Sequence, residues 1–328
     1  MHTVPPFWFL CALNTPVTLC VFNPEHDLCL ANGDANYVPP QSALDFARHG
    51  AGLMRIVYGP ESVAVAADGY ASWRAYAPDA VVGRIVAWGW DARLKQTLLK
   101  QGADSALMPS DGYIACLRDL QHRTTVLPLQ RDAWSVTGAD EVAALLARSP
   151  RLVLKAPWSG SGRGLRWVDG ALSAQDVAWI AKTVAAQRCV IAERRFDVEE
   201  NFAFEFHIAD GIVRLVGLSL FVTQSGVYRH NVLLDDDEIR RRVGVGPDQE
   251  KALCRWLQLN IAPRYSGYLG VDLFRTVDGR VVVSELNLRH TMGLVAHRVL
   301  QLHPELHGSV WEAKEYVELW EVKELKGS

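Results

Sequence analysis

Three side chains near the C-terminal end of the chain have the types and spacing of ligands for a hard metal ion. Glu285 and Asn287 stand two positions apart at the end of an apolar run, so on a β-strand both point to the same face. Asp272 lies in the preceding apolar run, which an Asp-Gly turn at 278–279 folds back against the second run. Because Mg²⁺ takes oxygen ligands and also accepts phosphate oxygens, convergence of these side chains predicts a metal site for a phosphorylated ligand.

A solvated hairpin with ordinary surface acids is the alternative. The segments 269–274 and 281–286 are mostly apolar, however, which indicates buried strands, and a buried acid needs a partner. The metal interpretation is therefore favoured. Arg289 follows Asn287 by two positions and is expected to face the same cleft, where its guanidinium could hold a phosphate or an oxyanion.

Lys155 and a glycine-rich stretch form a second candidate site, for phosphates. Lys155 lies near the end of an apolar run at 151–156, and the sequence Trp-Ser-Gly-Ser-Gly-Arg-Gly follows at 158–164. Glycines let the backbone approach phosphates and present N–H groups to them. The stretch is not a Rossmann fingerprint, because a strand is expected after it, and it is not a Walker loop, because no Gly-Lys-Ser/Thr closes it. Taken alone, such a stretch is more often a flexible turn.

The strand expected at 189–192 is a third candidate site, for a nucleoside, because Glu193 follows the strand and leads into a charged segment. A strand that offers its backbone to an adenine edge, followed by an acid for the ribose hydroxyls, would have this pattern. A strand leading into a charged surface loop would have it too, and for this segment alone that interpretation is favoured. The charged segment contains Arg194, Arg195, Phe196, Glu199 and Glu200.

Alternating strands and helices must position these side chains. Over the first 125 residues, apolar runs at 17–22, 54–58 and 81–88 predict strands, and helical spacing at 42–49 and 93–100 predicts helices, which indicates an α/β sheet. Asp140, Ser173 and Asp248 are expected to cap helices over 140–147, 176–186 and 249–259. Further strands are expected at 151–156, 165–168, 202–208, 212–220, 268–274 and 280–286.

Composition restricts the class of protein. The chain has 328 residues, 49% hydrophobic and 22% charged, with a formal net charge of -3, and these values are typical of globular proteins. No run of Lys or Arg indicates a nucleic-acid partner, and the apolar stretch 7–13 is too short for a membrane span and lacks the positive charge that precedes a signal sequence. Six cysteines without a CxxC pair favour reduced thiols in a cytoplasmic protein. A homodimer is left open.

In order and spacing, these segments resemble the ATP-grasp superfamily over roughly residues 120–300. The family order is a phosphate lysine, a glycine-rich loop, an adenine strand with a ribose acid, and late acidic metal ligands, and the candidates above follow it. The spacing of Asp272, Glu285 and Asn287 looks like that of D-alanine–D-alanine ligases. The sequence Glu-Leu-Asn-Leu-Arg at 285–289 is similar to the Glu-x-Asn-x-Arg of carboxylate–amine ligases.

The resemblance implies an α/β (α+β) architecture, an ATP-grasp fold preceded by an N-terminal open parallel-sheet α/β domain. It places the N-terminal domain at 1–125 and the ATP-grasp domain at 126–312, with lobes at about 126–192 and 193–312. A C-terminal helical tail would occupy 313–328.

The resemblance also implies a nucleotide site. Lys155 would bind the α- or β-phosphate, Glu193 would contact adenine together with the segment from Arg194 through Arg195 to Phe196, and Glu200, with Glu199 less favoured, would hold the ribose. The lid over the phosphates would run from Ser159 to Gly164 and include Gly160, Ser161 and Gly162.

Metal binding and catalysis are implied at the C-terminal motif. Mg²⁺, with Mn²⁺ as an alternative, would bind the three late ligands, and Arg289 would steady an acyl phosphate. The family usually has a second nucleotide lysine ahead of the grasp domain. Arg123 stands at about its place, and Lys95 is a weaker candidate.

The implied activity is that of an ATP- and Mg²⁺-dependent acid–amine ligase. The γ-phosphoryl group would pass to a small-molecule carboxylate, and an amine or another nucleophile would attack the acyl phosphate. A kinase that uses the same nucleotide site, or a non-catalytic nucleotide-binding protein, is the alternative.

Substrate contacts are harder to predict. His26 and Asp27 follow the first strand, where ligands of open α/β sheets sit, but a capped turn explains them equally well. Arg229 and Asn231 could bind a substrate carboxylate, although a solvated loop is somewhat favoured there. His290 could line the acceptor side.

Overall fold

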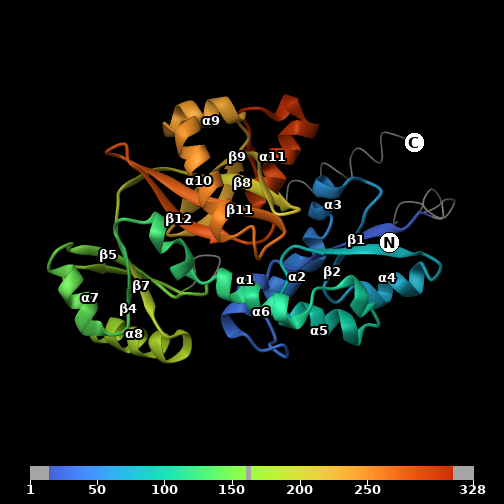
Figure 1. The fold of residues 1–328 in the computed structure, drawn as a ribbon, viewed down its shortest axis with the longest axis horizontal. Helices are drawn as coiled ribbons and strands as arrows, with labels where there is room; N and C mark the ends of the chain where they lie inside the picture. The colour runs from blue at the N-terminus through green and yellow to red at the C-terminus, as the bar shows by residue number, and fades with distance from the viewer. Residues whose placement is uncertain (1–14, 160–163, 313–328) are drawn as a thin grey trace.

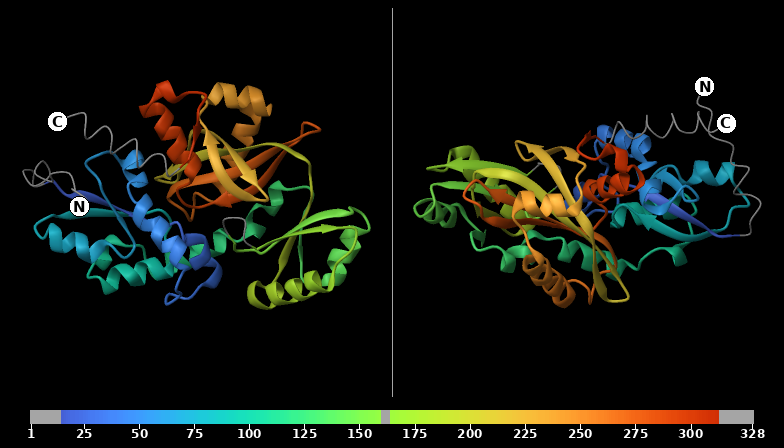
Figure 2. Two further views of the ribbon diagram at one scale, coloured as in Figure 1. Left: turned by 180° about the vertical axis from the view of Figure 1, so that it is seen from behind. Right: turned by 90° about the horizontal axis from the view of Figure 1, so that it is seen from above.

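The computed structural model describes residues 15–159 and 164–312, and three β-sheets organise them (Figure 1). A three-stranded sheet near the N-terminus and a four-stranded sheet lie at opposite ends of the molecule, with a six-stranded sheet between them (Figures 1 and 2). The fold is α/β, as the sequence predicted. The stretch 7–13, the loop residues Gly160, Ser161 and Gly162, and the tail 313–328 lie outside the described residues.

The N-terminal sheet has the strand order β2-β1-β3, and its strands are parallel. Helices cover the faces of such a sheet because both sides of a parallel sheet need apolar cover. The central strand β1 (Val17–Phe22) is fully buried from Leu19 to Phe22. The other elements here are β2 (Val63–Ala66), β3 (Val82–Ala87), α1 (His26–Asn32), α2 (Gln41–Gly50), α3 (Leu53–Tyr58), α4 (Tyr70–Tyr76), α5 (Ala92–Lys100), η2 (Ser105–Leu107), α6 (Asp111–Leu120) and η3 (Arg123–Leu129).

The strand predicted at 54–58 is wrong, because this segment forms α3. Its β-branched and aromatic composition suggested a strand, but Leu53, Met54 and Ile56 are buried on one side of a helix. The second strand of the sheet is β2, whose Val-Ala-Val-Ala sequence pairs with β1.

The four-stranded sheet is antiparallel, with the order β4-β7-β5-β6. Two helices pack on one face of it, while the other face turns toward the six-stranded sheet. A strand follows the glycine-rich stretch, as predicted. The elements are β4 (Ala133–Val136), α7 (Ala139–Leu146), β5 (Arg151–Lys155), β6 (Leu165–Asp169), α8 (Ala174–Gln187) and β7 (Val190–Arg194).

The six-stranded sheet has the order β12-β11-β8-β9-β10-β13. Phe202, Phe204 and Phe206 alternate along β8 and pack, with α9 and α10, on one face of the sheet. The helix α11 packs on the other face, beside α3. The elements are β8 (Val198–Ala209), β9 (Ile212–Gln224), β10 (Val227–Val232), α9 (Asp236–Val243), α10 (Pro247–Asn260), β11 (Gly267–Thr276), β12 (Val281–Asn287), α11 (Met292–Leu302), η4 (Pro304–Leu306) and β13 (Val310–Trp311).

The predicted helix starts are confirmed in one case of three. Ser173 caps α8 through a reciprocal hydrogen-bond pair with Asp176. Asp140 and Asp248 instead lie in the first turns of α7 and α10, whose N-caps are Gly138 and Gly246. In the described part of the chain, none of the helices is long and apolar enough to cross a membrane.

Candidate functional site

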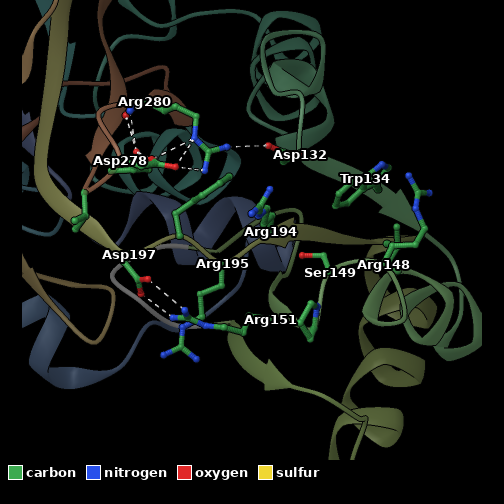
Figure 3. A pocket seen from close by; sticks show the side chains of 15 residues that line it. Asp132, Trp134, Arg148, Ser149, Arg151, Arg194, Arg195, Asp197, Asp278 and Arg280 are labelled. Atoms are coloured by element: carbon green, nitrogen blue, oxygen red, sulfur yellow. Dashed lines mark hydrogen bonds and ion pairs between the residues drawn. The ribbon is translucent and has the colours of Figure 1, made fainter.

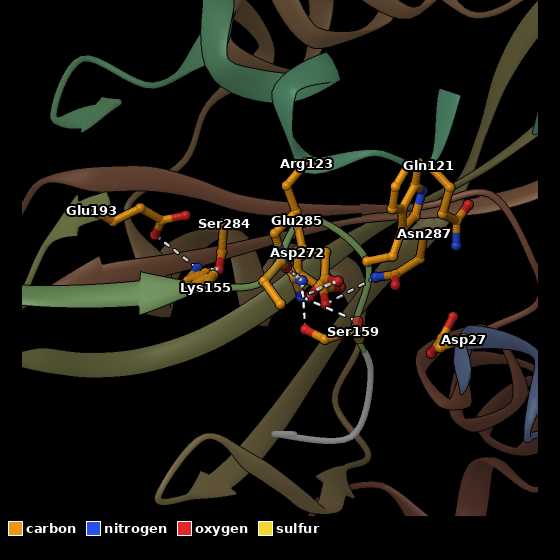
Figure 4. Close-up of polar contacts among 12 residues, drawn as sticks. Asp27, Gln121, Arg123, Lys155, Ser159, Glu193, Asp272, Ser284, Glu285 and Asn287 are labelled. Atoms are coloured by element: carbon orange, nitrogen blue, oxygen red, sulfur yellow. Dashed lines mark hydrogen bonds and ion pairs between the residues drawn. The ribbon is translucent and has the colours of Figure 1, made fainter. Parts of the chain in front are cut away.

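The three predicted metal ligands converge where β11 and β12 pair (Figure 4). Asp272 lies directly across from Glu285, and Asn287 is two residues further on β12. The side-chain amide of Asn287 donates to Oδ2 of Asp272 at 3.0 Å. The period of two along β12 therefore places both of its polar side chains on the face that carries Asp272.

The electrostatics of this cluster favour a cation. Burial and the neighbouring carboxylate of Glu285 together raise the pKa of Asp272 to about 7, against the charge of Arg289 and the hydrogen bond from Asn287. Two close acids and an amide oxygen form the hard oxygen donor set that Mg²⁺ prefers. The residues present thus fit a magnesium ion.

Arg123 links the cluster to the glycine-rich stretch. It is 7% exposed at the start of η3. Its guanidinium donates to Oε1 of Glu285 at 2.6 Å, to the backbone oxygen of Ala156 at 2.6 Å and to Oγ of Ser159 at 2.6 Å. Gly164 closes the stretch at φ +72°, where a Cβ would come within 2.9 Å of the Ser159 side chain.

A cavity of about 230 Å³ lies between the four-stranded and six-stranded sheets. On its wall, Nζ of Lys155 pairs with Oε2 of Glu193 at 2.7 Å and also donates to Oγ of Ser284 at 3.3 Å. Arg123, Arg194, Arg195 and Phe196 line the same cavity, so six residues predicted to bind a nucleotide surround one space. Arg195 also pairs with Asp169 at 2.9 Å.

Glu200, predicted to hold the ribose, does not line this cavity. Its carboxylate pairs with Arg242 of α9 at 2.6 Å, because residue 200 belongs to the face of β8 that packs on the helices. The neighbouring Asn201 points the other way and lines the cavity. Glu199 pairs with Arg275, and Lys95 pairs with Asp111, so neither lies at this cavity.

A second cavity, of about 300 Å³, lies on the N-terminal side of the metal cluster. Arg289 lines it and donates from Nε and Nη2 to the two carboxylate oxygens of Asp27 in α1, at 3.0 and 2.8 Å. Burial alone would raise the pKa of Asp27, but the charge and hydrogen bonds of Arg289 outweigh burial and lower it. Asp272 and Glu285 line both cavities and stand between them.

Of the other four residues predicted to contact the substrate, only Asn231 lines the second cavity. Asn231 is buried in β10, lines the second cavity and accepts a hydrogen bond from Tyr228 at 2.6 Å. Arg229 is exposed on the same strand and lines neither cavity, and the polar loop expected here is a strand. His26 is buried against Asp91, with its Nδ1 at 3.1 Å from the carboxylate.

His290 also lies outside both cavities. Its Nε2 is 2.8 Å from the Tyr58 hydroxyl, and its ring stacks on Trp88. Burial lowers the pKa of His290 to about 4, so its ring is neutral at physiological pH. His290 lines a separate cavity of about 220 Å³ instead.

Glu205 is a residue of the second cavity that the sequence prediction missed. It lies between Phe204 and Phe206, at an odd offset from the alternating phenylalanines, so it points away from that core, to the face of Asp272. A single acid at an alternate position of a strongly apolar strand was the available signal.

A larger cavity than these two, of about 670 Å³, lies away from the metal cluster (Figure 3). Five arginines and three aspartates line it. Arg151 pairs with Asp197 at 2.8 Å and Arg280 with Asp278 at 2.8 Å, so much of this charge is already compensated.

Comparison with solved structures shows the same fold in several synthetases and carboxylases. N5-carboxyaminoimidazole synthetase from Staphylococcus aureus, complexed with ADP, matches 92% of this chain and 79% of its own, with TM-score 0.50 and 12% identity. D-alanyl-alanine synthetase A from Vibrio cholerae matches 89% of this chain and 94% of its own, with TM-score 0.50 and 12% identity. Pyruvate carboxylase from Rhizobium etli matches 87% of this chain and 27% of its own, with TM-score 0.52 and 15% identity.

No protein-family model and no curated protein matches the chain in sequence. At these identities the likeness is one of fold. The chain has the ATP-grasp fold.

Proposed function

We propose that this chain, which has the ATP-grasp fold, is an ATP- and Mg²⁺-dependent ligase that activates a substrate carboxylate as an acyl phosphate and joins it to an amine. The observation that carries the proposal is that Asp272 and Glu285 line two cavities at once. A nucleotide in the cavity of Lys155 and a carboxylate in the cavity of Arg289 would meet at these acids. Holding two reactants in that geometry is a major source of rate enhancement.

The nucleotide cavity offers groups for each part of ATP. Lys155 would donate to a phosphate oxygen, and Arg123 would neutralise phosphate charge from beneath the glycine-rich stretch, in the place of the lysine that the chain lacks. The segment from Glu193 to Phe196 would hold the adenine, with Asn201 rather than Glu200 available to the ribose. Mg²⁺ or Mn²⁺ bound on Asp272, Glu285 and Asn287 would neutralise phosphate charge as a Lewis acid.

The chemistry would take two steps. A carboxylate oxygen of the substrate attacks the γ-phosphorus, and the bond from that phosphorus to the β–γ bridging oxygen breaks as ADP leaves. The amine then attacks the acyl carbon, the bond from this carbon to the phosphate oxygen breaks, and phosphate leaves while the amine loses a proton. Arg289 lines the cavity proposed for the carboxylate, and it would stabilise the charge that develops on the acyl phosphate oxygens.

The first test is nucleotide binding, because it needs no substrate. Calorimetry should show that ADP binds the wild-type chain and that Mg²⁺ tightens this binding. In Glu285→Gln the Mg²⁺ dependence should disappear, whereas in the matched variant Glu250→Gln, which removes an acid paired with Arg240 on the helical side, it should persist. Mg²⁺-dependent binding of equal strength in Glu285→Gln would contradict the proposal.

The second test is turnover. Pairs drawn from a panel of small carboxylic acids and amines are incubated with ATP and Mg²⁺, and ADP, phosphate and joined product are quantified. A ligase yields all three in equal amounts and loses this activity in Glu285→Gln. A phosphorylated hydroxyl compound without free phosphate would indicate a kinase instead.

A further inference from the structure

Glu205 is a buried acid that the proposed phosphoryl chemistry does not use. It is 1% exposed on β8 and lines the 300 Å³ cavity. On β11, Gly270 lies across from Glu205 and Asp272 lies across from Ala203. Glu205 is therefore on the face of the metal cluster, one strand repeat of about 7 Å further along.

The surroundings of Glu205 hold its carboxylate in one position. The hydroxyl of Ser219 donates to Oε1 at 3.0 Å, and the hydroxyl of Thr291 donates to Oε2 at 2.7 Å. A Cβ on Gly293 would lie 2.2 Å from Oε1, and a Cβ on Gly270 would lie 3.0 Å from Oε2. The two glycines thus leave space for the Glu205 carboxylate, and the two hydroxyl groups fix its position.

Glu205 has no cation in direct contact, because Arg289, whose charge reaches Glu205, is already paired with Asp27. Of the acids that line it, Asp27 is paired with Arg289, and Glu285 is paired with Arg123. Asp272 and Glu285 are the proposed metal ligands. Within the described residues, Glu205 makes no salt bridge and has only its two hydroxyl partners. Burial raises the pKa of Glu205 to about 8, which expresses the cost of a buried charge that lacks a counter-ion.

Aromatic side chains form the wall of the same cavity. Phe22 contacts Trp88 edge-on with ring centres 5.0 Å apart, and it contacts Phe46 edge-on at 5.6 Å. Phe221 and Tyr228 line the cavity as well. Faces of aromatic rings attract ammonium groups and accommodate apolar bodies.

We infer that this cavity binds its substrate through a primary ammonium group that pairs with Glu205, while an apolar part of the substrate contacts the aromatic wall. The inference rests on the proposed function for the reaction and narrows the substrates to amino compounds. Glu205 is a recognition residue in this scheme, and the position of the ammonium group is set by the carboxylate that Ser219 and Thr291 hold.

The test compares two probes of the same shape by calorimetry at constant ionic strength and pH about 8.5, above the pKa of about 8 of Glu205, where an alkylammonium group is still protonated. Phenethylammonium carries the charge, and 2-phenylethanol replaces it with a neutral hydroxyl group. The wild-type chain should bind the ammonium probe at least ~10-fold more tightly, as expected for a charge-assisted hydrogen bond. Glu205→Gln should reduce this preference to within about twofold. The matched variant Glu141→Gln, on α7 and hydrogen-bonded to Thr137, should keep it.

Two outcomes would overturn the inference. Equal affinity of the wild-type chain for the two probes would do so without any variant, and so would an undiminished ammonium preference in Glu205→Gln. Glu205→Asp keeps the charge but draws the carboxylate back by one methylene from the place where Ser219 and Thr291 hold it. It should also reduce the ammonium preference, so it keeps the test decisive if Glu205→Gln does not fold. Mg²⁺-dependent ADP binding is measured on the same samples. ADP binding without ammonium preference contradicts this inference alone, whereas absent Mg²⁺-dependent binding contradicts the proposed function.

Discussion

Two ion pairs flank the metal cluster, one buried and one half-buried, and they are positioned in different ways. Lys155 and Glu193 lie on β5 and β7, adjacent strands of one sheet, at a separation of 2.7 Å. Arg289 and Asp27 are 262 residues apart in sequence, and their pairing at 2.8 Å joins the segment after β12 to α1. Register within one sheet sets the first pair, whereas packing between two parts of the molecule sets the second.

The difference implies that the two cavities have different structural requirements. The side of the 230 Å³ cavity that carries Lys155 and Glu193 forms when the four-stranded sheet forms. The Arg289 pair also needs the N-terminal sheet to pack beside α11, through a cluster that includes Phe22, Met54 and Val299. We therefore expect substitutions at Lys155 to act on nucleotide affinity, and substitutions at Arg289 to act on both turnover and folding.

The largest effect is expected for Arg289→Met. Turnover should fall ~10²–10³-fold, because a charge that stabilises the transition state is removed. The variant also leaves Asp27 buried without its partner, so the free energy of unfolding should fall by about 3–5 kcal/mol. Steady-state ADP release and urea denaturation measure the two effects.

A double variant separates these two consequences. Asp27→Asn combined with Arg289→Met removes both charges, so stability should recover toward the wild-type value while turnover stays low. Recovery of turnover together with stability would show that Arg289 acts only as a link between α1 and the end of β12.

A smaller effect is expected for Lys155→Met. Loss of one charge-assisted hydrogen bond to a phosphate should weaken ADP binding by about 10–100-fold. Glu193 loses its partner at the same time and also belongs to the proposed adenine segment, so Glu193→Gln alone is measured beside Lys155→Met to separate the two contributions to ADP affinity. Calorimetric ADP affinity equal to that of the wild type in Lys155→Met would remove this residue from the nucleotide site.

The metal cluster between the two pairs should make Mg²⁺ binding depend on pH. Mg²⁺ requires the ionised carboxylate of Asp272, whose pKa is about 7 in the metal-free protein. Below that pH, Mg²⁺ affinity should fall about tenfold per pH unit, because one proton is released on binding. Calorimetry between pH 5 and 8 measures this slope. A Mg²⁺ affinity that does not change with pH would show that Mg²⁺ binding releases no proton from Asp272, and so that Asp272 is not a ligand.

The same shift has the opposite sign for the stability of the metal-free protein. The pKa of Asp272 is higher in the folded chain than the value of about 4 expected after unfolding. Its contribution to stability is therefore fully present below pH about 4 and is lost as the pH rises through about 7. Asp272→Asn should remove this part of the pH dependence of the melting temperature.

The contrast between local and long-range positioning also explains what the sequence could predict. Asp272, Glu285 and Asn287 came together as predicted because strand periodicity and one Asp-Gly turn determine their geometry. The pairing of Asp27 with Arg289 could not be predicted, since no local pattern relates α1 to the end of β12. The sequence also did not show which of Glu200 and Asn201, neighbours near the start of β8, points to the nucleotide cavity.

Composition misled the prediction elsewhere. The segment 54–58 has the β-branched content of a strand, but packing against β1 and α11 selects a helix. Tyr228, Arg229 and Asn231 have the polarity of a loop, but β9 and β13 pair with them as a strand. Tertiary contacts decided both segments, and short windows of sequence do not contain them.

The smallest effect is expected at Glu200, where the sequence-based assignment and the structure disagree. The family resemblance assigned this acid to the ribose, yet its carboxylate pairs with Arg242 of α9, on the face opposite the nucleotide cavity. Glu200→Gln should therefore change ADP affinity by less than about twofold, whereas Asn201→Ala should weaken it by up to about tenfold through the loss of one hydrogen bond. The pair of variants differs by one position along β8, so calorimetry on both reports directly which face of the strand meets the nucleotide. A larger loss in Glu200→Gln than in Asn201→Ala would mean that β8 turns its other face to the ribose when the nucleotide binds.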